Sequence, residues 1–113
     1  MIERRKYPRR DMECPLQIRV VDGDINSVKR NSFCKNISRV GLATMSFDFF
    51  PVNAIVHLQL FSETLGKILE VIGKVVWIKQ LRFQHKYKLG IEFVDNSPDV
   101  EIKILDILQK GYA

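Results

Sequence analysis

The chain has 113 residues, of which 46% are hydrophobic and 27% are charged. This balance excludes an intrinsically disordered chain, and the length allows one domain with its own core but no second domain. Eighteen Lys and Arg outnumber thirteen Asp and Glu, so the net charge is +5. The excess of positive charge favours an anionic partner, such as nucleic acid, a nucleotide or an acidic lipid.

The sequence shows no pattern of a membrane span, a secretory signal or a zinc site. No apolar stretch approaches the ~18 to 20 residues that span a bilayer, because Glu70 and Lys74 interrupt the segment 68–78. The N-terminus is charged and has no apolar signal region, so we expect a cytoplasmic protein without a membrane span. Cys14 and Cys34 lack CxxC spacing and neighbouring histidines, which predicts buried thiols and no zinc site.

The segment 1–12 is predicted to be a flexible basic arm that precedes a single domain over residues 13–113. Five cations crowd into residues 4–10, and the positive field therefore lies mostly at this end. Arg5 and Arg9 are four positions apart in this segment. A segment without regular structure can fold around an anion and bring both guanidinium groups to it.

Six stretches of the chain follow the period-two alternation of half-buried strands. In the first of them, Leu16 and Ile18 alternate with Gln17 and Arg19. The fifth is long enough to bend at Gly73. The predicted strands cover residues 14–22, 28–37, 41–47, 54–61, 67–80 and 87–94.

The end of the second predicted strand carries the run Asn36-Ile37-Ser38-Arg39-Val40-Gly41. Asn36 and Ser38 provide short hydrogen-bonding side chains, and Gly41 lets a ligand approach the backbone closely. Together with the arginine pair, this run predicts a nucleotide site. A plainer interpretation stays open, in which Asn36 and Ser38 form a turn, Gly41 forms a bulge and the basic arm is a solvated tail.

A helix is predicted over residues 98–110, because Ser97-Pro98-Asp99 supplies an N-cap, a first-turn proline and an acid, and Gly111 can end it. Its expected apolar stripe consists of Val100, Ile104, Leu105 and Leu108. Six antiparallel strands and one terminal helix predict an all-β fold. A six-stranded split barrel is favoured over a sandwich, because closure removes exposed strand edges.

At this point the chain resembles the PilZ family. The resemblance runs from Glu3-Arg4-Arg5-Lys6-Tyr7-Pro8-Arg9 through the Asn36 run to Leu89-Gly90-Ile91-Glu92-Phe93 and the closing helix. PilZ domains are six-stranded β-barrels that bind the bacterial second messenger cyclic di-GMP through RxxxR and [D/N]xSxxG motifs. The resemblance therefore implies cyclic di-GMP as the ligand, with no other cofactor and no metal.

The same resemblance assigns roles to single residues. It implies that Arg5 and Arg9 grip guanine and phosphate, that Asn36 and Ser38 contact a guanine, and that Gly41 keeps the surface open. An arginine suits this task, because its planar fork pairs with phosphate or with guanine O6 and N7 and its face stacks on a base.

Three further arginines enter through the same resemblance. Arg4 is similar to the arginine of members that bind two stacked ligand molecules per domain, so we expect two. Arg10 and Arg39 are expected to be auxiliary. The physical reason for Arg4 is that two ligands bring four phosphate charges, which one more guanidinium helps to neutralise.

No catalytic pattern accompanies these motifs. His57 and His85 have no nucleophile pattern nearby, and the sequence has no metal triad or phosphate loop, so we expect a receptor and no enzyme. Trp77 is interpreted as core or barrel surface.

We hypothesise that the arm folds over the ligand and alters a contact with a downstream protein. The alternatives are a ligand-free protein-interaction scaffold and, less favoured, a barrel that binds single-stranded nucleic acid.

Overall fold

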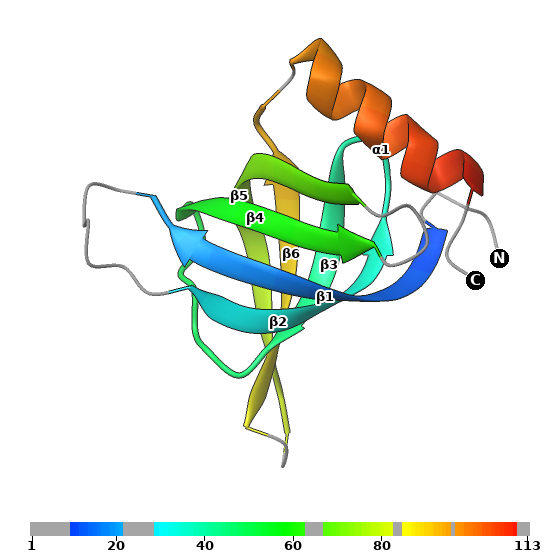
Figure 1. Ribbon diagram of the computed structural model, residues 1–113. Coiled ribbons are helices and arrows are strands. Elements are labelled where there is room, and N and C mark those ends of the chain that lie inside the picture. The colour runs from blue at the N-terminus through cyan, green and yellow to red at the C-terminus, as the bar shows by residue number, and fades with distance from the viewer. Residues whose placement is uncertain (1–9, 22–28, 63–66, 83–84, 96, 111–113) are drawn as a thin grey trace, which may run out of the picture.

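The computed structural model describes residues 10–21, 29–62, 67–82, 85–95 and 97–110, in which six strands are followed by one helix (Figure 1). The strands are β1 (Arg10–Val20), β2 (Arg30–Ile37), β3 (Gly41–Ser46), β4 (Ile55–Ser62), β5 (Lys67–Leu81) and β6 (Lys86–Phe93), and the helix is α1 (Pro98–Lys110).

The six strands close into a barrel in the order β1-β2-β3-β6-β5-β4, and every neighbouring pair is antiparallel. The barrel closes where Leu16 of β1 pairs with Leu60 of β4 and Val20 pairs with Val56. The predicted six-stranded barrel with a terminal helix is therefore confirmed, and the sandwich is wrong. Closure leaves each strand with a partner on both sides, which protects backbone groups that a sheet edge would expose.

The observed strand bounds differ most from the predicted ones at the start of β1. The strand begins at Arg10, four residues before the predicted start at Cys14, and so includes the last three residues of the predicted arm. Arg10 pairs with Ile37 and Asp11 pairs with Asn36, but the register shifts between Asp11 and Cys14. An irregularity of this kind interrupts the alternation of side chains, so periodicity alone could not detect this part of the strand.

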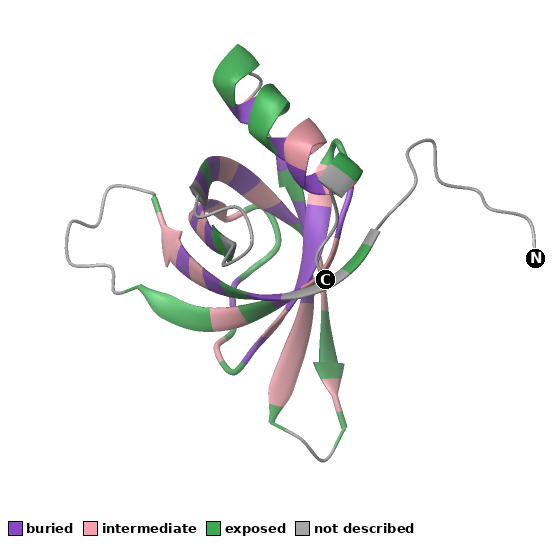
Figure 2. Cartoon of the chain, turned by 45° about the vertical axis from the view of Figure 1, so that its right-hand side comes forward, coloured by how far each residue is buried: buried purple, intermediate pink, exposed green. Residues whose placement is uncertain are grey.

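Buried residues alternate with less buried ones along the strands, as the purple bands of Figure 2 show. Apolar side chains at these buried positions fill the barrel. Leu16 and Ile18 of β1, Leu58 of β4 and Leu89 of β6 are among the fully buried ones. Helix α1 adds buried residues at a spacing of four and three positions, which is one face of a helix. These residues are Val100, Ile104 and Ile107.

The buried face of α1 differs from the predicted stripe at Leu105 and Ile107. Ile107 is buried, whereas Leu105 is only partly buried and Leu108 packs at the edge of the core. The helix lies across one end of the barrel and contacts β5 (Figure 1). Among the residues that the structure describes, no helix is long and apolar enough to cross a membrane.

The two cysteines lie directly opposite each other in the β1–β2 pair. Both are buried and free, as the sequence predicts. The hydrogen bond to Cys14 and burial raise the pKa of the Cys34 thiol far above its usual value. The single S–H of Cys34 donates to the backbone oxygen of Asn36, with Sγ 3.6 Å from that oxygen. The neutral thiol thus helps to hold β2 where its register changes.

Strand β5 changes its partner at Gly73, where a bend was predicted. Gly73 pairs with Val56 of β4 and with Phe93 of β6, so the first half of β5 belongs to one side of the barrel and the second half to the other. A Cβ at this position would lie 2.5 Å from Cγ2 of Ile91. The absence of a side chain therefore lets β5 turn this corner close to β6.

Candidate functional site

The turn between β2 and β3 is built by Ser38. Its backbone N–H donates to the carbonyl oxygen of Gly41 at 2.8 Å, and its Oγ accepts a hydrogen bond from the N–H of Val40 at 3.2 Å. Ser38 is only 5% exposed. The turn-forming interpretation of Ser38 is therefore confirmed, and the hydroxyl holds the shape of the turn that follows Asn36.

Gly41 lies at the first position of β3, where β6 comes very close. It pairs with Glu92, and a Cβ built on Gly41 would collide with the backbone oxygen of Ile91. The barrel itself therefore requires glycine here. The open surface for a ligand that the resemblance implies at Gly41 would be a second reason for glycine at this position.

Asn36 is partly exposed on the outer face of β2. Its neighbours Cys34 and Ile37 are buried in the core, and the β2–β3 register shifts between Cys34 and Asn36. The amide oxygen Oδ1 of Asn36 is buried and has no hydrogen-bond partner within the described part of the chain. A buried acceptor without a donor costs about 1–3 kcal/mol. Asn36 thus keeps a buried acceptor whose hydrogen-bonding capacity is unused among the described residues.

A row of outward positions extends from Asn36 across four strands. Asn36 pairs with Ala43, Ala43 pairs with Gly90, and Gly90 pairs with Trp77. Ala43 is buried but lies outside the core cluster, and a Cβ on Gly90 would collide with the indole of Trp77. The row therefore has small residues at its centre, with an amide at one end and an indole lying over the other.

Trp77 reaches this outer row because of an irregularity in β5. The β5–β6 register shifts between Val75 and Trp77, and Val75 is fully buried. A regular strand would turn both residues to the same side, but the extra residue Val76 places Trp77 on the opposite side. The sequence predicts Trp77 in the core or on the barrel surface, and no sequence signal marks the bulge that brings it beside Gly90.

The arm joins the barrel beside the same turn. Because Arg10 pairs with Ile37, β1 begins next to Ser38 at the end of β2. Arg4, Arg5 and Arg9 lie outside the described residues, as does the side chain of Arg10. Their contacts with Asn36 or with a ligand therefore remain predictions.

Arg39 links the turn to the helix. Its Nη2 donates a hydrogen bond to Oε1 of Glu101 at 3.2 Å, and both side chains are about half exposed. Both residues line a pocket of about 440 Å³ between the turn, the end of β6 and α1. Arg39 is thus positioned by α1, next to Ser38, and its expected auxiliary role in binding is a prediction.

The two histidines lie outside this row, His57 on β4 and His85 in the β5–β6 turn. His57 Nε2 is 3.9 Å from Oε2 of Glu70, and His85 occupies a turn with a positive φ of 49°. Among the described residues, no three His, Cys, Asp or Glu side chains gather as metal ligands would.

Comparison with protein families gives the class of this domain. The family model of the PilZ domain matches residues 3–110. The chain belongs to the PilZ family, and the resemblance read from its motifs is confirmed. Among curated proteins, none matches the chain.

Solved structures share the fold at low sequence identity. The PilZ domain of YcgR from Escherichia coli with c-di-GMP is 14% identical at a TM-score of 0.75, and the match covers 96% of this chain and 91% of that one. The inhibitor of motility MotI/DgrA of Bacillus subtilis is 22% identical at a TM-score of 0.71, with coverage of 96% and 51%. The K. pneumonia MrkH-c-di-GMP complex is 19% identical at 0.74, with coverage of 96% and 52%. The chain thus spans half the length of MotI and MrkH.

Proposed function

We propose that this chain is a bacterial receptor for cyclic di-GMP that binds the messenger and does not react with it. Membership of the PilZ family and the c-di-GMP complexes of YcgR and MrkH support this proposal. The observation that carries it is the buried amide oxygen of Asn36, which has no partner among the described residues.

The proposed binding mode assigns a ligand group to each part of the site. Guanine offers N–H donors on its Watson–Crick edge, and Asn36 Oδ1 can accept one of them. Arg5 and Arg9 pair with phosphate and with guanine O6 and N7, and Ser38 and Gly41 shape the turn on which the guanine rests. The chain meets the ligand from two sides, because β1 begins beside this turn.

The number of ligands is part of the proposal. Arg4 directly precedes the principal pair in the sequence, and Arg10 and Arg39 are proposed auxiliaries. Two stacked ligands carry four phosphate charges, which the guanidinium group of Arg4 helps to neutralise. We therefore expect two molecules per chain.

Isothermal titration calorimetry with cyclic di-GMP tests both the ligand and the site. Removing one partner of a buried charge pair costs about 2 to 5 kcal/mol, so Arg5→Ala and Arg9→Ala should each weaken binding at least about thirtyfold. The matched control is Arg82→Ala, which removes an exposed arginine of the β5–β6 turn and should bind like the parent chain.

Each outcome of this titration has a distinct meaning. No heat from folded parent protein would overturn the receptor and favour the ligand-free scaffold. Binding with a stoichiometry near one would refute only the second ligand molecule. Equal losses in Arg82→Ala and Arg9→Ala would show that general positive charge, and not the arginine pair, holds the messenger.

The relay of the signal is proposed to use the N-terminal arm. When the ligand binds, residues 1–12 fold over it and change the surface that is offered to a downstream protein. Hydrogen exchange of these amides should slow on addition of cyclic di-GMP. Trp77, the single tryptophan of the chain, provides a second readout, because its indole lies in the same row as Asn36. Unchanged exchange in residues 1–12 would contradict the arm movement while leaving the binding site intact.

A further inference from the structure

A second cluster of side chains occupies the outer face of the barrel, one step along the strands from the Asn36 row. Phe33 of β2 pairs with Met45 of β3, and Met45 pairs with Lys88 of β6. Phe33 is 41% exposed, and Phe47, just past the end of β3, is 70% exposed. Cross-strand neighbours project to the same side of a sheet, so these apolar groups form one surface.

Two lysines lie over the aromatic rings of this surface. Lys35 Nζ is 5.7 Å from the ring centre of Phe33, and Lys86 Nζ is 5.3 Å from that of Phe47. Both distances fall in the range of cation–π attraction. We call this surface the lysine–phenylalanine face and define it by Phe33, Lys35, Met45, Phe47 and Lys86.

The lysine–phenylalanine face is hollowed. All five of its residues line a groove of about 360 Å³ that runs between β2, β3 and the start of β6. The described lining of this groove contains two lysines and no carboxylate. The groove therefore combines an apolar floor with positive charge at its sides.

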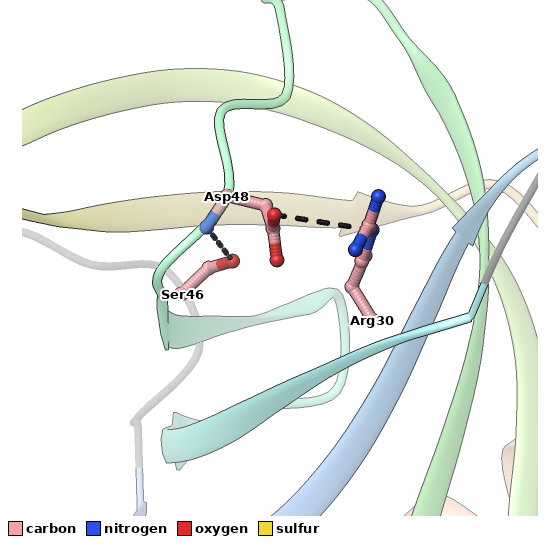
Figure 3. Close-up of polar contacts among 3 residues, drawn as sticks. All are labelled: Arg30, Ser46 and Asp48. Atoms are coloured by element: carbon pink, nitrogen blue, oxygen red, sulfur yellow. Dashed lines mark hydrogen bonds and ion pairs between the residues drawn. The ribbon is translucent and has the colours of Figure 1, made fainter.

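The turn that carries Phe47 is held in place by polar contacts (Figure 3). The backbone N–H of Asp48 donates to Oγ of buried Ser46 at 3.0 Å, and Oδ1 of Asp48 lies 3.8 Å from Nε of Arg30. Because both neighbours of Phe47 are fixed, its ring is presented to solvent by a defined turn. Such preorganisation lowers the cost of binding a partner.

We propose that the lysine–phenylalanine face docks an acidic, apolar segment of a partner protein. Exposed phenylalanines and a partly exposed methionine around a groove are typical of a protein interface, and burying them in a complex is favourable. The lysines supply the complementary charge for Asp or Glu of the partner. Docking itself does not depend on ligand binding, whereas its use as the output surface rests on the proposed function.

Single-stranded nucleic acid fits this face less well. A nucleic-acid groove tracks phosphates with free cations and leaves aromatic faces open for bases. Here the ammonium groups of Lys35 and Lys86 lie over the rings themselves, which leaves less of each ring face open to a base. A peptide with an apolar side chain fits the apolar floor of the groove, and acidic residues beside it carry the charge opposite to that of the two lysines.

The face lies beside the proposed messenger site. Lys35 is the extra residue where the β2–β3 register shifts between Cys34 and Asn36. A ligand bound to Asn36 would therefore contact the residue directly after Lys35, which belongs to the lysine–phenylalanine face. This continuity places a candidate output surface next to the input site on the same strand.

Selection of peptides on the full chain, without cyclic di-GMP, tests the docking proposal. A phage-displayed library of random peptides serves as the probe, and the peptides recovered are synthesised and titrated. We expect them to be rich in Asp and Glu around an aromatic or aliphatic residue. Phe47→Ser and Lys86→Glu should each weaken their binding at least about tenfold, as loss of a central interface residue does.

The matched control is Phe61→Ser on β4, because Phe61 is also an exposed phenylalanine, at 44%. Its binding should equal that of the parent chain. Failure to recover peptides, recovery of peptides without acidic residues, or equal weakening by Phe61→Ser would overturn the proposal. Displacement of the peptides by oligothymidylate would assign the face to nucleic acid instead. Because no messenger is present, these results stand apart from any failure of the receptor proposal.

Discussion

At the scale of single residues, one short motif contains three different physical roles. Ser38 closes the β2–β3 turn with its backbone and hydroxyl, and Gly41 allows β6 to approach β3. Asn36 does neither and keeps a buried acceptor without a partner among the described residues. The motif therefore combines two residues that stabilise the fold, Ser38 and Gly41, with one residue, Asn36, that makes neither of these structural contributions.

Substitutions in the motif should separate folding from binding. Asn36→Ala removes an unsatisfied buried acceptor, so the free energy of unfolding should stay equal or rise by up to about 1–3 kcal/mol, while affinity for cyclic di-GMP falls. Gly41→Ala forces a methyl group against the backbone of Ile91, which should lower the free energy of unfolding by about 1–3 kcal/mol. Urea unfolding of both variants and the parent chain measures these changes.

The control for this pair is Ser38→Ala, which removes the hydroxyl that accepts from Val40 N–H. It should cost about 0.5–1.5 kcal/mol, the usual net value of one hydrogen bond. If Asn36→Ala destabilises the chain as much as Ser38→Ala does, Asn36 has a structural role and its assignment as the ligand acceptor loses its main support.

At the scale of elements, α1 is attached to the barrel by apolar packing and touches the site by an ion pair. Ile104 is buried among the core residues. Glu101 of α1 forms a half-exposed ion pair with Arg39, which lies in the turn that follows Asn36. Buried apolar contacts stabilise far more than surface ion pairs do. The helix is therefore held by its inner face, and the ion pair positions Arg39.

Two substitutions on α1 should differ strongly in their effect. Ile104→Ala leaves a cavity and should lower the free energy of unfolding by about 2–5 kcal/mol. Glu101→Ala should change it by no more than about 1 kcal/mol. Ile102→Ala is the matched control, because Ile102 is 64% exposed. Denaturant midpoints of the three variants give the comparison, and equal losses for Ile102→Ala and Ile104→Ala would contradict the observed orientation of the helix.

At the scale of the whole molecule, charge and closure act together. The net charge of +5 is concentrated near the N-terminus, with five cations between residues 4 and 10. Barrel closure places the start of β1 against the end of β2. The most basic segment of the chain is thereby joined to the barrel beside Ser38 and Asn36, which is where the proposed anionic ligand binds.

Affinity for cyclic di-GMP should therefore fall as salt rises. Between about 0.1 M and 1 M ionic strength the Debye length shortens from about 10 Å to about 3 Å, which screens attraction between exposed charges. Calorimetry across this range should show several-fold weaker binding. Asn36→Ala should keep the salt dependence of the parent chain because its amide is neutral, whereas Arg9→Ala should reduce it. A salt-independent affinity would argue against phosphate recognition by the arm.

The sequence by itself determined the elements and the family. Alternation along each strand and the N-cap of the helix are local patterns, so five of the six strands and α1 begin within two residues of the predicted positions. Both motifs are also contiguous runs, and they carried the resemblance that the family model confirms. These features were predictable because neighbouring residues alone decide them.

Only the tertiary structure decided which residues of neighbouring strands lie beside each motif. The early start of β1, the position of Trp77 above Gly90 and the groove beside Phe47 all depend on strand register and on irregularities near Met12, Lys35 and Val76. One extra residue reverses the side on which the following side chains lie, and the partner strand is distant in sequence. For that physical reason, the motifs could be predicted from the sequence, whereas the residues that surround them in space are seen only in the tertiary structure.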